Sequence, residues 1–431
     1  MSTPVSLADR TETYRIGSGR VLLTPTPVEH IVSWKLSFRT LPAFAEGEEL
    51  VQELVVHLLD KGTRKRDRFA VAEVLENRGA RLDFSNDGLH VRVSGRALRD
   101  DVPDVLAMLA EQLREPLFDA QEFDKARAQL AARFHRSMDS TSSQAASALS
   151  QRLYQPAHPN FTPSPAEHLA QLQTITLEQV QAYHAAHFGG ADLLVAAVGD
   201  ADASAFVGAL ERSLGDWPAG STQGPFETQG APQAPARVAV PMPDKTNLDV
   251  RLGQALRVRR QDEDYLPLFL ANYILGGNFS ARLMAIIRDE MGLTYGIRSS
   301  LNGITTDHEG DWRVSVTLSQ DNLERGIEAT QAEVRRFITE GATADELDDK
   351  KTTALGSFTV GMATTRGLAA MLLRNAERGF EVSYLDAYPD LIEGVTLDQL
   401  NEAVQRHADP DAFHLTLAGQ LPTPTPAEAQ P

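Results

Sequence analysis

Arg288 and Tyr295 are side chains whose types could serve catalysis. They lie seven positions apart in the segment ILGGNFSARLMAIIRDEMGLTYGIRSSL, residues 274–301. The pattern predicts an amphipathic helix that stops at Gly292, with Arg288 near its end and Tyr295 in the strand that follows. A guanidinium and a phenol hydroxyl aimed at one carbonyl group stabilise the negative charge that develops on its oxygen. Because neither group generates a nucleophile, the pair needs a further catalytic group.

Judged from these residues alone, a structural role explains the segment better than a catalytic one. An arginine near a helix C-terminus interacts favourably with the helix dipole, and tyrosine is common in strands. The preceding Gly276-Gly277 pair lacks the spacing and the lysine of a phosphate-binding loop, so a turn before a helix explains it.

Length and composition restrict the class of protein. A chain of 431 residues is too long for one ordinary core, which predicts two or more domains. The formal charge of −18 argues against nucleic-acid binding. An acidic surface could attract basic peptides, although a solvated surface is the simpler explanation.

Cysteine is absent, which excludes disulfides and thiolate metal sites and favours a cytoplasmic location. No secretory signal or membrane-spanning apolar run is visible, so no membrane association is expected.

The chain divides into nearly equal halves at a segment rich in Pro, Gly, Ala and Gln. This segment, residues 217–244, is predicted to be a linker. It separates a domain at 1–216 from a domain at 245–420, and residues 421–431 are predicted to be a disordered tail.

The two halves contain a short internal repeat. ITLEQV at 175–180 matches VTLDQL at 395–400 with an offset of 220, and the same offset pairs His187 with His407 and Gly199 with Gly419. Each copy predicts a threonine-capped helix, a short turn and an apolar strand. His184 and His187 share the first of these helices and are interpreted as structural. Two copies of one domain are the simplest account.

The predicted elements mix strands and helices in both halves. In the first half we expect strands at 20–23 and 31–38, helices at 48–59, 70–78, 102–114 and 121–136, and a hairpin over 80–95. The second half repeats this order from a strand at 248–258 and a helix at 265–275. Hairpins among helices favour an α+β fold, in which helices cover mixed, mainly antiparallel sheets.

Three segments resemble the insulinase/pitrilysin/mitochondrial processing peptidase family of inverzincin-type zinc peptidases. They are LLDKGT at 58–63, YHAAHFGGADLLVAAVGD at 183–200, and the segment from Leu275 to Tyr295. The resemblance implies two tandem homologous α+β domains that form one half of a clam-like chamber. It also implies that Arg288 and Tyr295 reach into a zinc active site.

The zinc motif of this family is degenerate here. Active members carry His-x-x-Glu-His on the helix before LLDKGT, with two histidine ligands, a glutamate general base and a third ligand further along the chain. The same register gives Glu53, Val56 and His57, and the third ligand position falls on Arg133. One histidine without a general base is not a hydrolytic site, so no metal is expected on this chain.

Glu53 and His57 share a helix face and could hold a metal weakly. A hydrogen bond or ion pair between them is the favoured interpretation, because a closed site needs more protein ligands. Arg133 would repel a cation and is predicted to bridge to Glu53. An active enzyme that uses Glu53 and His57 with an unusual metal is disfavoured, since Val56 supplies no base.

The sequence therefore suggests the non-metal subunit of a heterodimeric zinc metallopeptidase, inactive by itself. Its expected partner is a homologous subunit with an intact His-x-x-Glu-His motif and the zinc. Arg288 and Tyr295 would act in trans on a peptide held in the chamber. A homodimer is expected when the partner is absent. The alternative is a catalytically inert scaffold or peptide-binding homologue of the same family.

Overall fold

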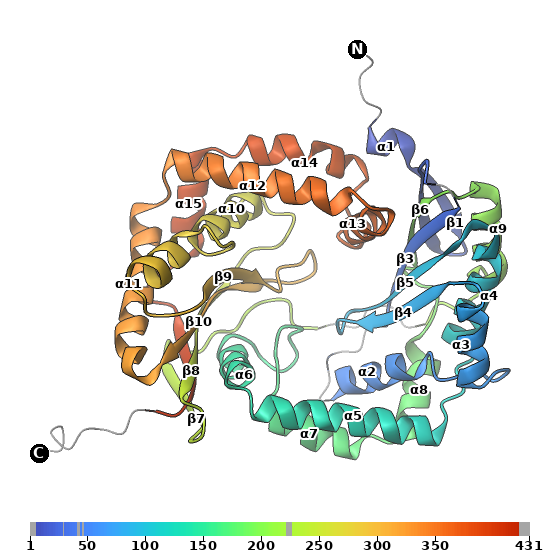
Figure 1. Cartoon of the computed structure of the whole chain (residues 1–431), viewed down its shortest axis with the longest axis horizontal. Coiled ribbons are helices and arrows are strands. Elements are labelled where there is room, and N and C mark those ends of the chain that lie inside the picture. The colour runs from blue at the N-terminus through green and yellow to red at the C-terminus, as the bar shows by residue number, and fades with distance from the viewer. Residues whose placement is uncertain (1–5, 29, 41–43, 45–46, 221–225, 422–431) are drawn as a thin grey trace, which may run out of the picture. The chain divides into compact units, whose positions relative to one another are not determined.

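The protein forms two compact units, each assembled from segments of both halves of the chain (Figure 1). The computed structural model describes residues 6–28, 30–40, 44, 47–220 and 226–421. Unit 1 comprises residues 1–132, 170–226 and 355–390, and unit 2 comprises residues 133–169, 227–354 and 391–431.

Unit 1 contains a six-stranded sheet in the order β1-β2-β6-β3-β5-β4. Neighbouring strands are antiparallel except β2 and β6, which are parallel. The strands are β1 (Glu12–Ile16), β2 (Gly19–Pro25), β3 (Ile31–Arg39), β4 (Arg81–Asn86), β5 (His90–Leu98) and β6 (Leu194–Gly199). Its helices are α1 (Leu7–Arg10), α2 (Glu48–Leu58), α3 (Arg68–Glu76), η1 (Arg99–Asp101), α4 (Val102–Arg114), α8 (Leu177–His187), α9 (Ala203–Leu214) and α13 (Thr365–Glu377).

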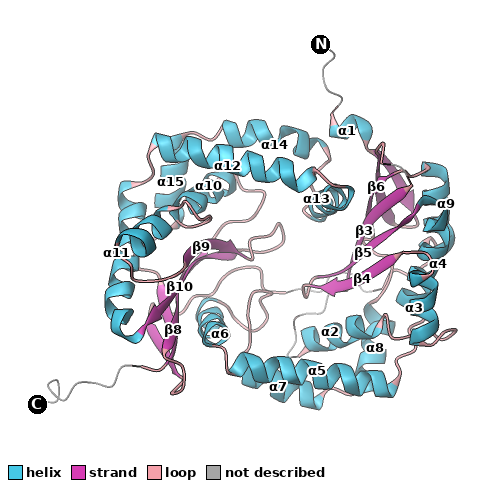
Figure 2. Cartoon of the chain, in the orientation of Figure 1, coloured by secondary structure: helices cyan, strands magenta, loops and turns pink. Residues whose placement is uncertain are grey.

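Unit 2 contains a five-stranded sheet in the order β7-β11-β8-β10-β9, in which only β7 and β11 are parallel. The strands are β7 (Arg237–Pro241), β8 (Asn247–Leu256), β9 (Ile297–Asn302), β10 (Gly310–Ser319) and β11 (His414–Gly419). Its helices are α6 (Thr141–Leu153), α10 (Tyr265–Leu275), η2 (Met284–Glu290), η3 (Gln320–Asn322), α11 (Leu323–Glu340) and α15 (Leu397–His407). Figure 2 distinguishes these helices and strands by colour.

The predicted repeat is present as a repeated topology. Strands β2, β6, β3, β5 and β4 of unit 1 correspond in order and direction to β7, β11, β8, β10 and β9 of unit 2. Helices α8 and α15 lie 220 residues apart, and each begins with the same capping box, from Thr176 with Gln179 and from Thr396 with Gln399. These side chains satisfy backbone N–H groups that the first helical turn leaves unpaired. The α+β fold with two mixed sheets is confirmed.

Each unit receives one helix from the other half of the chain. Helix α6 packs on β8 and β11, where the hydroxyl of Thr416 donates a hydrogen bond to the carbonyl of Ala145 at 2.7 Å. Helix α13 packs on β3 and β6. The chain passes between the units after residue 226 and within four helices, α5 (Ala120–Met138), α7 (Pro165–Thr174), α12 (Ala344–Met362) and α14 (Ser383–Glu393).

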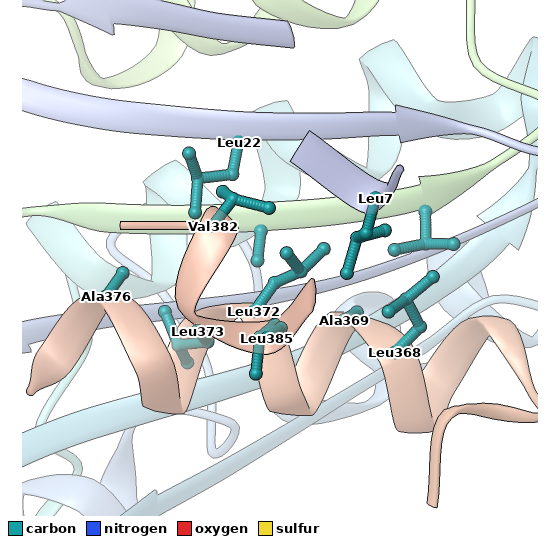
Figure 3. Packing of buried hydrophobic residues seen from close by; sticks show 11 residues of the cluster. Leu7, Leu22, Leu368, Ala369, Leu372, Leu373, Ala376, Val382 and Leu385 are labelled. Atoms are coloured by element: carbon teal, nitrogen blue, oxygen red, sulfur yellow. The ribbon is translucent and has the colours of Figure 1, made fainter. Parts of the chain in front are cut away.

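Apolar side chains explain why α13 belongs to unit 1. Its residues Leu368, Ala369, Leu372 and Leu373 meet strand residues of unit 1 in one buried cluster (Figure 3). The cluster also contains Leu7, Leu22, Ala196, Val198, Ala376, Val382 and Leu385. Burying each leucine side chain contributes about 2 kcal/mol, so the helix is held mainly by this face.

The segment predicted as a linker contains a strand that the sequence analysis did not predict. Strand β7 alternates exposed and half-buried residues, and it pairs with β11 through the register of Val238 with Thr416. The strand is hard to predict from sequence because it has only five residues at the sheet edge, contains a proline and has polar neighbours. The domain boundaries at 216 and 245 remain predictions, as does the tail at 421–431, most of which lies outside the described residues.

Candidate functional site

The position of the degenerate zinc motif lies on α2, which is anchored to the neighbouring hairpin by Gln52. The amide of this fully buried side chain donates hydrogen bonds to the Thr40 hydroxyl at 2.6 Å and to the Gly88 carbonyl at 3.2 Å. Its oxygen accepts a hydrogen bond from Asn86 at 2.7 Å. A buried amide with all these partners fixes α2 against the β4–β5 hairpin.

Glu53 and His57 form the predicted pair on this helix. The Glu53 Oε1 to His57 Nε2 distance is 3.7 Å, which is within ion-pair range but too long for a good hydrogen bond. The two side chains are close enough for the predicted ion pair when His57 is protonated. Arg133 lies on α5, where its guanidinium is 4.9 Å from the ring of Phe134. Its bridge to Glu53 stays a prediction.

A cavity of about 380 Å³ opens beside this pair. Glu53, Val56 and His57 line one side, and residues 82–86 of the edge strand β4 line the other. Lys61 and Asp60 also line the cavity.

The residues around this cavity do not fit zinc. Val56 has no donor atom at the place of the general base, and Asp60 on the lining is paired with Lys61 at 3.0 Å. Across the parts of the chain that the structure describes, no three His, Cys, Asp or Glu side chains are grouped to hold a metal ion. A structural zinc site takes four ligands and a catalytic one takes three, so no step through zinc is assigned to this chain.

Arg288 lies on a π-helix rather than on the predicted α-helix. Helix η2 spans Met284–Glu290, and the Met291 N–H donates to the Ile286 carbonyl at 3.0 Å. The helix ends before Gly292, as predicted, because this glycine has a φ of +63°. A π-helical turn is rare and frequently marks a functional site.

The Arg288 side chain is one-third exposed and is held by two neighbours. Its Nη1 lies 3.2 Å from Asp289 Oδ1, and its guanidinium carbon lies 5.0 Å from the ring centre of Phe279. The ring presents its negative face to the cation. Phe279 is itself 71 % exposed, which leaves this pair accessible to a ligand.

Tyr295 lies two residues before β9 and not within the strand as predicted. Its side chain is completely exposed, whereas its neighbour Thr294 is buried. The Thr294 hydroxyl donates to the Thr317 carbonyl of β10 at 2.6 Å and accepts from the Gly296 N–H at 3.1 Å. Thr294 thus fixes the backbone on both sides of Tyr295, and the phenol projects into solvent.

A second anchor holds the start of the same segment. Arg282 donates to Glu346 of α12 at 2.6 Å and to the Gly341 carbonyl at 3.0 Å. Burial acts to raise the pKa of the Glu346 carboxyl, but hydrogen bonds from Arg282 and from the Thr343 backbone lower it to about 2. Within the described residues, no hydrogen bond, ion pair or ring contact joins Arg288 to Tyr295. The Gly292 N–H donates to the Arg288 carbonyl at 3.1 Å, which closes the helix three residues before Tyr295.

Two family profiles match the sequence along most of its length. Residues 51–162 match the profile described as insulinase (peptidase family M16), and residues 174–354 match the profile described as peptidase M16 inactive domain. The chain belongs to the insulinase family. The family predicted from residues 58–63, 183–200 and 275–295 is therefore confirmed.

Individual relatives of this insulinase-family chain agree in length and fold. The non-peptidase homolog YmxG of Helicobacter pylori is 22% identical over 377 residues, covering 87% of this chain and 85% of that protein. The uncharacterized zinc protease SCO5738 of Streptomyces coelicolor is 23% identical over 321 residues, covering 72% and 68%. A crystal structure of a peptidase M16 inactive domain from Pseudomonas fluorescens superposes with a TM-score of 0.85 at 24% identity, covering 96% of this chain and 99% of that one.

The histidines of α8 have structural roles in this insulinase-family fold. His184 Nε2 hydrogen-bonds to the Leu113 carbonyl at 2.8 Å, and its ring packs against Phe118 and Phe188. Burial lowers the pKa of His184 and of His187, which favours neutral rings.

Sequence reasoning missed a group of arginines on the sheet of unit 2. Arg251, Arg298 and Arg313 line a cavity there together with the Gly276-Gly277 turn. A signal was available: polar residues alternate along β8, β9 and β10, for example Arg298, Ser300 and Asn302, which predicts one polar face on the sheet.

Proposed function

We propose that this chain is the non-metal subunit of a heterodimeric zinc metallopeptidase. Its partner is a homologous chain with an intact His-x-x-Glu-His motif, which holds the zinc and activates water. This chain contributes Arg288 and Tyr295, whose cation and hydroxyl donor stabilise the oxyanion of the scissile carbonyl. By itself the chain is inactive.

The exposure of Tyr295 carries this proposal. A phenol that is wholly in solvent, on a backbone held by buried Thr294, contributes little to the folded state of the isolated chain. An exposed Arg288–Phe279 pair lies in the same segment. Side chains held in place without burial are suited to a ligand that another molecule brings.

The substrate in this proposal is an unfolded peptide enclosed between the two subunits. Edge strand β4 offers an unpaired side for strand addition, next to the cavity that contains Glu53 and His57.

The same proposal includes the assembly and the location of the protein. Two such halves pair into a chamber, the chain forms a homodimer when the partner is absent, and the location is cytoplasmic. In the described part of the chain, no helix combines the length and apolar character needed to cross a bilayer.

Reconstitution with a zinc-motif homologue tests the proposal. The chain alone is expected to hydrolyse no peptide and to carry no stoichiometric zinc. The mixture is expected to be active, and Tyr295→Phe is expected to reduce that activity about tenfold or more, which corresponds to about 1.4 kcal/mol of transition-state stabilisation. Tyr14→Phe, on strand β1 of unit 1, is the matched control and is expected to leave the activity unchanged.

A catalytically inert scaffold or peptide-binding protein is the second candidate. The name of the relative YmxG, a non-peptidase homolog, favours it. This candidate predicts that no zinc-motif homologue gains activity from the chain, and that Tyr295→Phe changes nothing. Full zinc-dependent hydrolysis by the pure chain would exclude both candidates.

A further inference from the structure

A cavity of about 650 Å³ lies on one face of the unit 2 sheet. Its floor is formed by β8, β9 and β10, and its walls include Ser142 of α6 and the Gly276-Gly277 turn. Its volume is in the range of small-molecule sites and is ample for one amino-acid side chain. The cavity has no role in the proposed oxyanion stabilisation.

Three arginines lie close together on the floor of this cavity. Ser315 of β10 is paired with Arg251 of β8 on one side and with Arg298 of β9 on the other. Residues opposite one another in a sheet project from the same face, so the two arginines flank Ser315 at about 5 Å between neighbouring strands. Arg313 lies two positions from Ser315 on β10 and shares this face.

Two of these arginines already have carboxylate partners. Arg313 makes two hydrogen bonds to the buried Asp311, at 3.1 and 3.0 Å. Arg251, which is 8% exposed, contacts Asp249 at 3.4 Å and the Val250 carbonyl at 3.0 Å. These contacts compensate two of the three positive charges.

Arg298 is the uncompensated cation. It is exposed, and its guanidinium has no hydrogen bond or ion pair to any residue that the structure describes. Asp249, which lines the same cavity, is engaged elsewhere, since it also accepts hydrogen bonds from Thr141 at 2.6 Å and from Thr317 at 2.8 Å. The group of three arginines and two aspartates is therefore positive, in a chain whose formal charge is −18.

Mutual repulsion makes an anion favourable here. Burial lowers the pKa of Arg251, and the positive charges of Arg313 and Arg298 act in the same direction. A carboxylate that enters the cavity would offset this repulsion and would accept the charge-assisted hydrogen bonds that Arg298 lacks.

We propose that this cavity is a subsite for an acidic side chain of a bound peptide, whose carboxylate pairs with Arg298 in front of Arg251 and Arg313. The cavity adjoins the Arg288–Tyr295 segment, because Phe279 lines it and Arg298 follows Tyr295 by three residues. Three extended residues span about 10 Å. If the scissile carbonyl lies at Tyr295, which rests on the proposed function, the acidic residue lies about three positions from it.

Peptide binding to the full chain tests this subsite without any partner subunit. The probes are two short dye-labelled peptides with amidated C-termini, identical except for one central Glu or Gln, and fluorescence anisotropy reports their affinity. The Glu peptide is expected to bind about tenfold tighter than the Gln peptide. Arg298→Gln is expected to abolish this difference, and Arg298→Glu is expected to make a matched Lys peptide the tighter ligand.

The matched control is Arg325→Gln, which removes an exposed arginine from α11 of the same unit and is expected to preserve the preference for Glu. Equal affinity for the Glu and Gln peptides, absence of binding by the Glu peptide, or a preference that survives Arg298→Gln would overturn the proposal. So would a Gln peptide with a free C-terminus that binds as tightly as the Glu peptide, because the cavity would then recognise a chain terminus. None of these results depends on hydrolysis. If Arg288 and Tyr295 do not act on a partner's zinc site, the reconstituted activity is absent, but the peptide-binding results are unaffected.

Discussion

The cavity beside α2 and the segment from η2 to β9 are the chemically informative regions of the two repeats, and they differ in what they retain. In unit 1, residues 59–80 connect α2 to the edge strand β4, and in unit 2, residues 276–296 connect α10 to the edge strand β9. The connections are nearly equal in length. The first contains an ordinary α-helix, and the second contains a π-helix with Arg288.

The side chains of the two regions differ more than their backbones. Beside α2, two of the ligand positions hold Glu53 and His57, the third falls on Arg133, and the base position holds Val56. Beside β9, Arg288 is one-third exposed and Tyr295 wholly exposed, and buried Thr294 holds the backbone next to Tyr295. His57 is at least as exposed as Arg288, so the two regions differ in the chemistry of their side chains and not in access. The fold supplies positions at the sheet edge, and the residues at those positions decide the chemistry.

Restoring the zinc ligands beside α2 is expected to have the largest effect, because it would give unit 1 the metal site that it lacks. The triple variant Glu53→His, Val56→Glu, Arg133→Glu recreates the family's ligand set in its register. It is expected to bind zinc at least about 100-fold tighter than the native chain, because two ligands join His57 and the positive charge of Arg133 is removed. Zinc titration by calorimetry measures this effect. Unchanged affinity would mean that these positions do not share a site.

Gly276→Ala tests how tightly the turn is packed against β9. A Cβ atom at this position would lie 2.5 Å from the Ser299 nitrogen, which donates to the Gly276 carbonyl. We expect the free energy of unfolding to fall by about 2 kcal/mol. Gly296→Ala is the matched control, because no atom lies within 4 Å of its Cβ. Equal losses for both variants in urea denaturation would contradict the packing argument.

The Arg282–Glu346 anchor predicts a pH-dependent contribution to stability. Because the Glu346 pKa is lowered from 4.5 to about 2, its contribution is complete above pH 4.5 and is lost as the pH falls towards 2. Glu346→Gln is expected to cost about 1.5 kcal/mol at neutral pH and almost nothing near pH 2. Urea denaturation across this range measures the difference, with the exposed Glu328→Gln as control. A cost independent of pH would argue against the ion pair.

Thr294→Val is expected to have the smallest effect. The variant keeps the shape of the side chain and removes the hydrogen bonds to Thr317 and Gly296. We expect a loss of about 1 kcal/mol in stability, together with a reduced activation of the partner, since Tyr295 is less well positioned. Thr317→Val removes a hydroxyl that bonds to Asp249 instead and serves as the control in both assays. Equal activation by Thr294→Val and the native chain would contradict the claim that Thr294 positions Tyr295.

The fold could be predicted from the sequence where periodicity and capping were strong. Thr176 and Thr396 each cap the start of a helix, and these matching caps revealed the repeat, because capping is a local signal. Strand β7 was missed because it is short and depends on its partner β11. The exchange of α6 and α13 between the units depends on which apolar faces meet, which no local pattern encodes.

The candidate site was predicted in its residues but not in its geometry. The positions of Arg288 and Tyr295 follow from the family resemblance, whereas the π-helix depends on hydrogen bonds that only the assembled segment shows. The arginine-lined cavity escaped prediction because its members come from three strands, and their proximity requires the sheet register.

The central claim is that Arg288 and Tyr295 stabilise charge that forms only in the transition state on the partner's zinc. The most direct test is to measure kcat and KM separately for the reconstituted complex that carries Arg288→Gln and Tyr295→Phe. The account predicts that kcat falls by about 100-fold or more while KM stays within about twofold, because the lost interactions are absent from the ground state. An unchanged kcat, with or without a higher KM, would contradict it.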